Sequence, residues 1–317
     1  MTRRGYVGIL LALLCGAPML HAATPAADDA ARSLPLWAGD TPTHAGTITE
    51  RSDDPALPDR IIENVRTPYL AVHAPARPSG VALLVTPGGG YARIVLDKEG
   101  TALVPAFVEA AGITLFVLRY RLPDSAHAEG ADAPLADAQR AMRVIRSRAA
   151  EFGIDPARVG VMGFSAGGHV AARLATAVAP VHPARDATDR FDWRPAFAVL
   201  VYPVISMDDG LAHAGSRARL LAADTADTRT AMARLSPERH VDAATPPLFL
   251  LHAQDDAVVP VGNALAMHSA AVAAGVPASL HVFPYGGHGF GVRGAHGPLA
   301  RWPQLVLDWI NDQNATP

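Results

Sequence analysis

The stretch VGVMGFSAGGHVAARLA, residues 159–175, joins an apolar run, a serine among glycines and an alanine-rich helical pattern. The apolar run is typical of a buried strand, and the spacing after the serine predicts a helix. Residues 163–167 therefore lie at a strand-to-helix turn and fit the Gly-x-Ser-x-Gly pattern of a nucleophile elbow. The glycines are needed because a side chain at either position would collide with the neighbouring strand or helix. Such a turn would hold the Ser165 hydroxyl at a helix N-terminus, where backbone N–H groups favour negative charge.

The pattern around this turn alternates strands with helices. Apolar runs predict strands at 69–73, 81–85, 114–118, 159–164, 196–202, 248–252 and 279–283, the first with one exposed face. Helical spacing predicts helices at 103–111, 135–152, 166–179, 263–274 and 298–310. This alternation predicts an α/β fold, with a mostly parallel central sheet and helices on both faces.

The beginning of the chain has the composition of an export signal. Residues 1–22 start with Arg3 and Arg4, continue as an apolar stretch and end in small residues, as secretory signal peptides do. Pro18 interrupts the apolar stretch, which is also shorter than the ~20 residues that a membrane-spanning helix needs. We therefore expect a periplasmic or secreted bacterial protein that does not insert into the membrane after the signal is removed.

The remainder divides into two parts. Residues 23–59 are rich in Pro, Asp and Thr without periodicity, which predicts an extended N-terminal segment. Residues 60–317 form the expected catalytic domain. Between residues 203 and 247 the alternation lapses, which predicts an irregular insertion of loops and short helices over the sheet edge.

Charge and cysteine content exclude several classes of partner. Without Arg3 and Arg4, 25 of the 27 basic residues remain against 30 acidic ones, a formal net charge of −5. No basic run is present, so nucleic acid and anionic membrane surfaces are not expected partners. Cys15 is the only cysteine and falls in the signal, so no disulfide is expected in the mature chain. The oligomeric state is not predicted.

A glycine-rich segment after an earlier strand suggests an oxyanion hole. Acyl transfer requires N–H donors aimed at the developing oxyanion, and glycines allow the backbone to approach it closely. One donor usually follows the nucleophile, and the others come from an early strand-to-helix loop. Gly89, Gly90 and Ala166 are the candidate donors. We expect Tyr91 to contribute to the substrate-binding wall.

The serine needs a base. His169 follows it by four residues, but its side chain should point into helix packing and find a backbone partner. The chain order Ser…Asp/Glu…His favours a later histidine. His288 lies in the glycine-rich loop PYGGHGFG (284–291) after a predicted strand, whereas His281 lies within that strand and His296 beyond the loop. His288 is the predicted base.

The base needs an acid to fix its orientation. Asp255 and Asp256 directly follow the strand at 248–252 and, being adjacent, point in different directions. We predict that Asp256 is the acid and that Asp255 forms a turn or tethers a loop.

Five segments together resemble the α/β-hydrolase carbohydrate esterases of the acetyl esterase and acetylxylan esterase type, which are related to bacterial feruloyl-esterase-like proteins and are often labelled xylanases. These segments are PGGGY (87–91), GIDPARVGVMGFSAGGH (153–169), SPERHV (236–241), PPLFLLHAQDDAVVP (246–260) and HVFPYGGHGFG (281–291). The resemblance runs from about residue 64 to residue 310. It implies the same nucleophile, acid, base and oxyanion donors as above. Pro87 departs from it, since many related esterases have a histidine there. Glu99 and Arg121 recur in the family pattern, and we expect them to anchor loops or helix caps.

The resemblance implies an exported serine esterase that removes acetyl or other small acyl groups from O-acetylated plant cell-wall polysaccharides or oligosaccharides such as xylan. No cofactor is expected, and no metal-ligand motif such as His-Glu-x-x-His is present. The constellation suits acyl transfer, whereas glycoside hydrolysis ordinarily needs two facing carboxylates. The alternatives are a feruloyl or short-chain carboxylesterase, a serine peptidase of the prolyl oligopeptidase type, and a non-catalytic carbohydrate-binding protein. This chain has no spare length for the propeller domain that such a peptidase carries. A non-catalytic binding protein is expected to have lost a triad member, and all three are present here.

Overall fold

The computed structural model describes residues 1, 32–37, 39 and 46–315. The expected signal peptide, 1–22, lies outside the described residues except for Met1. Among the residues described, no helix is both long enough and apolar enough to cross a membrane.

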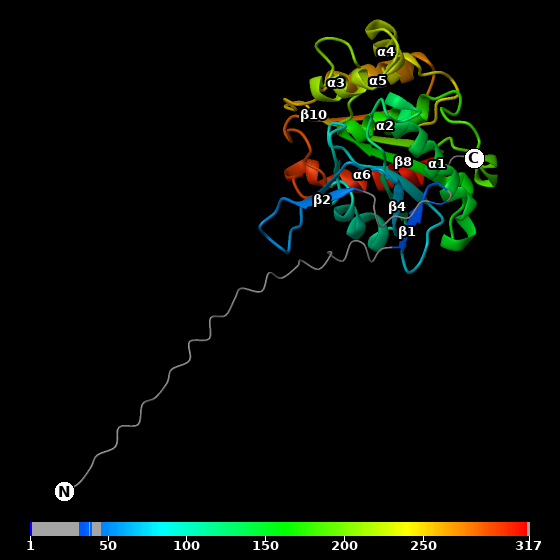
Figure 1. Cartoon of the computed structure of the whole chain (residues 1–317). Coiled ribbons are helices and arrows are strands. Elements are labelled where there is room, and N and C mark those ends of the chain that lie inside the picture. Colours follow the sequence, from blue (N-terminus) through cyan, green and yellow to red (C-terminus); the bar gives the residue numbers. More distant parts are fainter. Residues whose placement is uncertain (2–31, 38, 40–45, 316–317) are drawn as a thin grey trace.

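The described chain forms an eight-stranded central sheet in the order β1-β4-β7-β5-β8-β9-β10-β11 (Figure 1). Neighbouring strands from β7 to β11 are parallel, and β4 is antiparallel to both β1 and β7. The predicted α/β fold with a mostly parallel sheet is confirmed. The strands are β1 (Arg32–Pro35), β4 (Tyr69–His73), β5 (Ala82–Thr86), β7 (Thr114–Arg119), β8 (Val159–Phe164), β9 (Ala198–Val201), β10 (Leu248–Ala253) and β11 (Ala278–Phe283).

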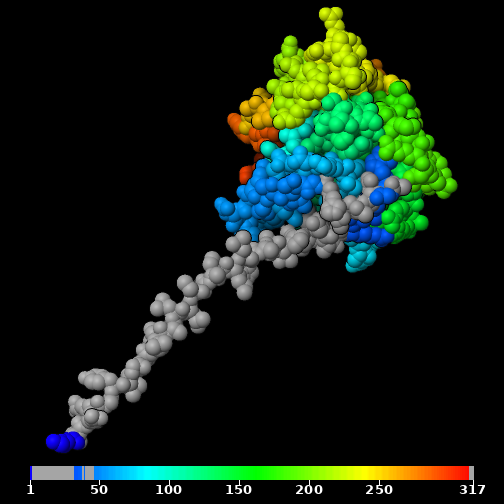
Figure 2. Space-filling model, viewed as in Figure 1, coloured from blue at the N-terminus to red at the C-terminus, as the bar shows by residue number. Residues whose placement is uncertain are grey.

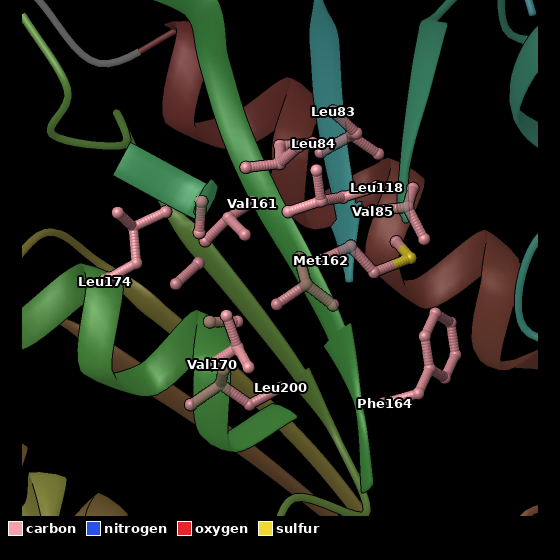
Figure 3. Packing of buried hydrophobic residues seen from close by; sticks show 14 of the residues in the cluster. Leu83, Leu84, Val85, Leu118, Val161, Met162, Phe164, Val170, Leu174 and Leu200 are labelled. Atoms are coloured by element: carbon pink, nitrogen blue, oxygen red, sulfur yellow. The ribbon is translucent and has the colours of Figure 1, made fainter. Parts of the chain in front are cut away.

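The centre of the sheet is covered on both faces, which explains its continuous apolar runs. Leu84 of β5 lies opposite Val161 of β8 in the parallel register, and both side chains are fully buried. Val170 and Leu174 of the helix α2 (Ser165–Thr176) belong to the same core cluster (Figure 3). This packing fixes the end of β8, and with it the turn that carries the serine.

The helices differ from the predicted ones mainly at their ends. The helix expected at 135–152 is α1 (Ala133–Ser147), followed by a separate 3₁₀ turn (Ala149–Phe152) that ends at Gly153 with φ +63°. The helix expected at 103–111 is a 3₁₀ turn (Thr101–Leu103) and a π-helix (Val104–Ala110). The helices α5 (Gly262–Ala273) and α6 (Trp302–Ala315) complete the cover of the sheet, the latter after a 3₁₀ turn (Gly297–Arg301).

Several strands lie outside the predicted set. The strand β1 falls in the segment expected to be extended and pairs with the free edge of β4. A second sheet contains β2 (Thr47–Glu50), β3 (Arg60–Glu63) and β6 (Ile94–Val95). The prediction that the strand at 69–73 has one exposed face is wrong. Tyr69, Leu70, Ala71 and Val72 are all buried, because β4 lies between β1 and β7 and both of its faces join the core.

The segment between β9 and β10 contains the helices α3 (Ala214–Ala222) and α4 (Thr228–Arg234) and a 3₁₀ turn (Pro237–Arg239). Its yellow-green atoms form the upper end of the molecule in Figure 2. Buried Asn263 of α5 fixes the start of this segment, because its Oδ1 accepts hydrogen bonds from the backbone N–H groups of Ile205 and Ser206. The segment is therefore held firmly beside the sheet edge where β8 and β10 end.

Candidate active site

The serine lies on a strained turn at the end of β8. Ser165 has φ +52°, a left-handed conformation that non-glycine residues rarely adopt. The glycines on either side of Ser165 are required because a side chain would not fit at either position. A Cβ at Gly163 would lie 2.4 Å from the carbonyl oxygen of Gly167, and one at Gly167 would lie 2.0 Å from that of Thr86. The expected reason for the glycines is confirmed.

A chain of hydrogen bonds runs from Ser165 to two residues that follow later strands. The Ser165 hydroxyl lies 2.8 Å from His288 Nε2, and His288 Nδ1 lies 2.7 Å from Asp256 Oδ2. A carboxylate can only accept, so His288 carries its proton on Nδ1 and its Nε2 accepts from the serine. Asp256 follows β10 and His288 follows β11, and the carboxyl ends of these parallel strands share one sheet edge with β8. The structure thus brings together the three side chains predicted from the sequence.

The local environment keeps Asp256 ionised. Burial alone would raise the pKa of this carboxyl, but hydrogen bonds with His252 and His288 and from the Val259 N–H hold it well below its ordinary value. His252 was missed in the sequence analysis. Its Nε2 lies 3.0 Å from the Val259 carbonyl and 3.3 Å from Asp256 Oδ2. Asp256 is therefore a fixed, negatively charged acceptor for the His288 N–H.

The glycine loop after β5 packs directly against the serine turn. A Cβ at Gly88 would lie 2.8 Å from Ser165 Cβ, so only a glycine permits this approach. Gly89 and Gly90, with φ +137° and +65°, line the same pocket as Ser165 and His288. Ala166 follows Ser165 in the first turn of α2. The three candidate donors are therefore next to the serine.

A buried carboxylate links the two loops of the site. Glu99 accepts a hydrogen bond from the Gly88 N–H (2.7 Å) and another from the Tyr202 hydroxyl (2.9 Å). The Tyr202 oxygen in turn accepts from the Gly291 N–H (3.1 Å), in the loop that carries His288. Burial raises the pKa of Glu99. Glu99 is thus the loop anchor that the sequence analysis expected, but the tyrosine that extends it gave no local signal.

His169 and Tyr91 form a separate pair in the core. His169 is fully buried, its Nε2–H donates to the Leu235 carbonyl (2.6 Å), and its Nδ1 accepts from the Tyr91 hydroxyl (2.7 Å). Burial, with a contribution from Arg173, lowers the pKa of His169 to about 3, so the ring is neutral. The prediction that His169 is a core histidine with a backbone partner is confirmed.

The expectation for Tyr91 needs correction. Its side chain is 2% exposed and its hydroxyl is committed to His169, so it does not line the pocket that contains Ser165. It borders an adjoining pocket that shares Ala92 and Arg219 with the first.

Asp255 and Arg121 act as anchors, as expected. Asp255 Oδ1 accepts from the Gly287 N–H (2.8 Å) and tethers the loop that carries His288. Arg121 lies away from the serine, where it pairs with Asp137 (2.8 Å) and Glu129 (3.0 Å).

The pocket above Ser165 has a volume of about 380 Å³ and an unusual charge. Ser165, His288, Gly89 and Gly90 line it. Its lining also includes Arg93, Lys98 and Arg219, which we call the pocket cations.

The fold and the arrangement of this site are those of an α/β hydrolase. The chain belongs to the BD-FAE family, whose match covers residues 73–270. It is 36% identical over 219 residues to an acetylxylan esterase of Xylanibacter ruminicola, covering 68% of this chain and 42% of that protein. It is 35% identical over 210 residues to an endo-1,4-beta-xylanase B of Butyrivibrio fibrisolvens, covering 66% of this chain and 32% of that one. The chain thus spans less than half the length of these two relatives.

Solved structures match it over more of their length. An acetyl ester-xyloside bifunctional hydrolase from Caldicellulosiruptor lactoaceticus superposes with a TM-score of 0.73 at 33% identity, covering 90% of this chain and 98% of that one. A carboxylesterase from Lactobacillus plantarum gives a TM-score of 0.62 at 25% identity, with coverages of 86% and 99%.

Proposed function

We propose that this chain is an exported serine esterase that removes acetyl or other small acyl groups from O-acetylated plant cell-wall polysaccharides or oligosaccharides such as xylan. The observation that carries the proposal is the hydrogen-bonded chain from the Ser165 hydroxyl through His288 to Asp256. The names of its relatives support a sugar ester as substrate, and the leader expected at residues 1–22 supports export.

In the first half of the reaction, Ser165 Oγ attacks the ester carbonyl carbon while His288 Nε2 takes the serine proton. The carbonyl oxygen becomes an oxyanion, which the N–H groups of Gly89, Gly90 and Ala166 stabilise. The intermediate collapses, the bond to the sugar oxygen breaks, and His288 returns the proton to the departing alcohol. The product of this half is an acyl ester on Ser165.

In the second half, water attacks the acyl carbon and gives a proton to His288. The second intermediate collapses, the bond to Ser165 Oγ breaks, and the serine regains its proton from His288. The acid is released, which is acetate for an acetyl ester. Throughout, Asp256 holds the ring by its Nδ1–H and stabilises the imidazolium that forms in both halves.

The test is acetate release from p-nitrophenyl acetate and from acetylated xylan by the wild type and by Ser165→Ala. Loss of the nucleophile should lower kcat by at least ~10⁴-fold. The exposed Ser125→Ala is the matched control, and it should retain full activity. If the wild type releases acetate no faster than Ser165→Ala, the enzymatic proposal is wrong.

Feruloylated arabinoxylan and a proline-containing peptide, assayed beside acetylated xylan, separate the alternatives. A clear preference for the feruloyl ester would favour the feruloyl esterase alternative. Cleavage of the peptide would favour the peptidase.

A further inference from the structure

The pocket above Ser165 concentrates positive charge on a chain that is acidic overall. Arg93, Lys98 and Arg219 all line it, although the formal net charge of the chain is −3. Lys98 is the single lysine among 317 residues. The attack on a neutral acetyl ester requires none of these charges, because the oxyanion is met by backbone N–H groups.

Within the described residues, no carboxylate forms an ion pair with any of these pocket cations. Arg219 donates to the backbone carbonyl of Gly215 (3.1 Å), and the buried Nε of Arg93 has no hydrogen-bond partner. Arg51 lines the same pocket but is paired with Asp59 at 2.6 Å. None of the three pocket cations therefore has a carboxylate at ion-pair distance among the described residues.

The acid in the pocket lining, Glu99, forms no direct hydrogen bond with any of the three pocket cations, although its charge attracts the neighbouring Lys98. Glu99 is 2% exposed, and its two oxygens already accept from the Gly88 N–H and the Tyr202 hydroxyl. His213 also lines the pocket, and burial, then His288 and Arg219, lower its pKa, so its ring is neutral and adds no charge. An anion that enters the pocket therefore meets three cations against the one buried carboxyl of Glu99.

Arg93 and Lys98 are half-buried and Arg219 is exposed. Like charges that line one pocket repel one another, and an anionic ligand relieves that repulsion. A guanidinium matches a carboxylate geometrically, through two parallel N–H···O bonds, and the pocket presents two of them with an ammonium. The volume of about 380 Å³ is in the size range of pockets that hold small organic ligands.

We propose that this pocket recognises a carboxylate on the substrate, so that the favoured substrates are acetyl esters of acidic sugars, that is, of uronic acid residues or sugars that carry them. This inference rests on the proposed esterase function. Because an acetyl group is uncharged, the carboxylate of an acetyl ester lies in the alcohol part, which is the sugar. The pocket cations would hold that carboxylate while the ester carbonyl reaches Ser165.

The experiment compares two substrates that differ only at C6: an acetylated methyl glucuronoside and the equivalent acetylated methyl glucoside. We expect kcat/KM for the glucuronoside to be at least about tenfold higher in low salt, as for a charge-assisted contact. The preference should shrink as NaCl is raised, because the partly exposed cations become screened. Equal kcat/KM values for the two esters in low salt overturn the inference.

The variants assign the preference to the pocket. The Lys98→Gln/Arg219→Gln double variant should lower the glucuronoside-to-glucoside ratio of kcat/KM by at least about fivefold. The control is Arg229→Gln, an exposed arginine of α4 outside the pocket, which removes a charge but should leave the ratio intact. If both variants lower the ratio alike, the effect belongs to net charge and the proposed site is wrong.

Two further arms keep the test decisive. Unacetylated methyl glucuronoside should inhibit wild-type hydrolysis of p-nitrophenyl acetate at least about fivefold more strongly than methyl glucoside, which needs no variant to fold. A hemisuccinate of the neutral glucoside places the carboxylate on the acyl side, and its preference over both acetyl esters overturns the assignment to the sugar. Hydrolysis of both acetyl esters at one rate refutes only this inference, whereas hydrolysis of neither refutes the proposed function itself.

Discussion

Basic side chains gather in two regions of this molecule, and the described residues neutralise them in one region but not in the other. Around Trp37, three arginine guanidiniums lie over the indole ring, at 6.0, 5.1 and 4.2 Å from its centroid for Arg121, Arg140 and Arg185. Each also pairs with carboxylates, from the set Asp137, Glu129, Asp186 and Asp189. We call these eight residues the Trp37 cluster. The pocket cations above Ser165 have no such partners among the described residues.

This difference distinguishes cations that stabilise the fold from cations that are available to bind a ligand. A buried cation whose carboxylates are in place contributes to a fixed arrangement, and removal of one partner leaves the other unpaired. In this case the arrangement holds the segment after β1 against α1, since Trp37 Nε1 also donates to Asp137 (3.2 Å). A cation without a partner contributes little to folding and can meet a ligand. The two regions should therefore respond oppositely to substitution.

The largest effect is expected from Asp137→Asn in the Trp37 cluster. Asp137 is fully buried and accepts from Trp37, from the Arg121 backbone and from the Arg121 guanidinium. The substitution removes a negative charge with which the largely buried Arg121 guanidinium pairs. This should cost about 4 kcal/mol of unfolding free energy. Urea denaturation measures this. Asp209→Asn, at the 92% exposed partner of Arg217, is the control and should change stability by less than about 0.5 kcal/mol.

Trp37→Ala should cost somewhat less, about 3 kcal/mol, because it removes a buried indole and the surface on which the arginines pack. Trp37→Phe keeps a ring and loses the Nε1 hydrogen bond, so it should cost only about 1 kcal/mol. Thermal unfolding of both variants measures the difference. Equal losses would mean that the hydrogen bond, and not the ring, holds this segment.

Acid should weaken the Trp37 cluster over a definite range of pH. Burial alone would raise the pKa of Asp189, but the Arg185 backbone N–H and the Arg143 guanidinium hold it at about 2, below the ordinary 3.8. Since the folded pKa is the lower one, this stabilisation is present above about pH 4 and is lost as the pH falls toward 2. The loss is about 2 kcal/mol. In urea titrations at pH 5, 4, 3 and 2, Asp189→Asn should show a flatter decline, and a decline as steep as that of the wild type would contradict this assignment.

The smallest change in unfolding free energy is expected from a substitution in the pocket above Ser165. Arg219→Gln removes a charge without a carboxylate partner among the described residues, so the unfolding free energy should stay within about 0.5 kcal/mol of the wild type. The same denaturation series measures it. A loss near that of Asp137→Asn would show that this cation is structural and would erase the contrast between the two regions.

The sequence carried most of the information about the strands and the three aligned side chains. A nucleophile elbow is local, because Gly163, Ser165 and Gly167 lie within one turn. Asp256 and His288 are distant in the chain, but both directly follow apolar runs, and parallel strands deliver their ends to one edge. The predicted alternation of strands and helices was therefore enough to place Ser165, Asp256 and His288 at one edge of the sheet.

Contacts that depend on side-chain direction could not be predicted. Tyr91 follows the three glycines and looked available for substrate, yet its φ of +60° accompanies a side chain that points into the core. Tyr202 meets Glu99 across 103 residues, and nothing near either residue indicates the other. The strand β1 was missed because four residues in a Pro-rich stretch carry no usable periodicity.

The bridge through Glu99 couples two loops whose bridged residues, Gly88 and Gly291, are 203 positions apart in the chain. Because one carboxylate holds the glycine loop directly and the histidine loop through Tyr202, a redesign of either loop also disturbs the other. Directed evolution of this scaffold toward new acyl groups should therefore find its productive changes in the segment from 203 to 247, which borders the pocket without bearing on that bridge.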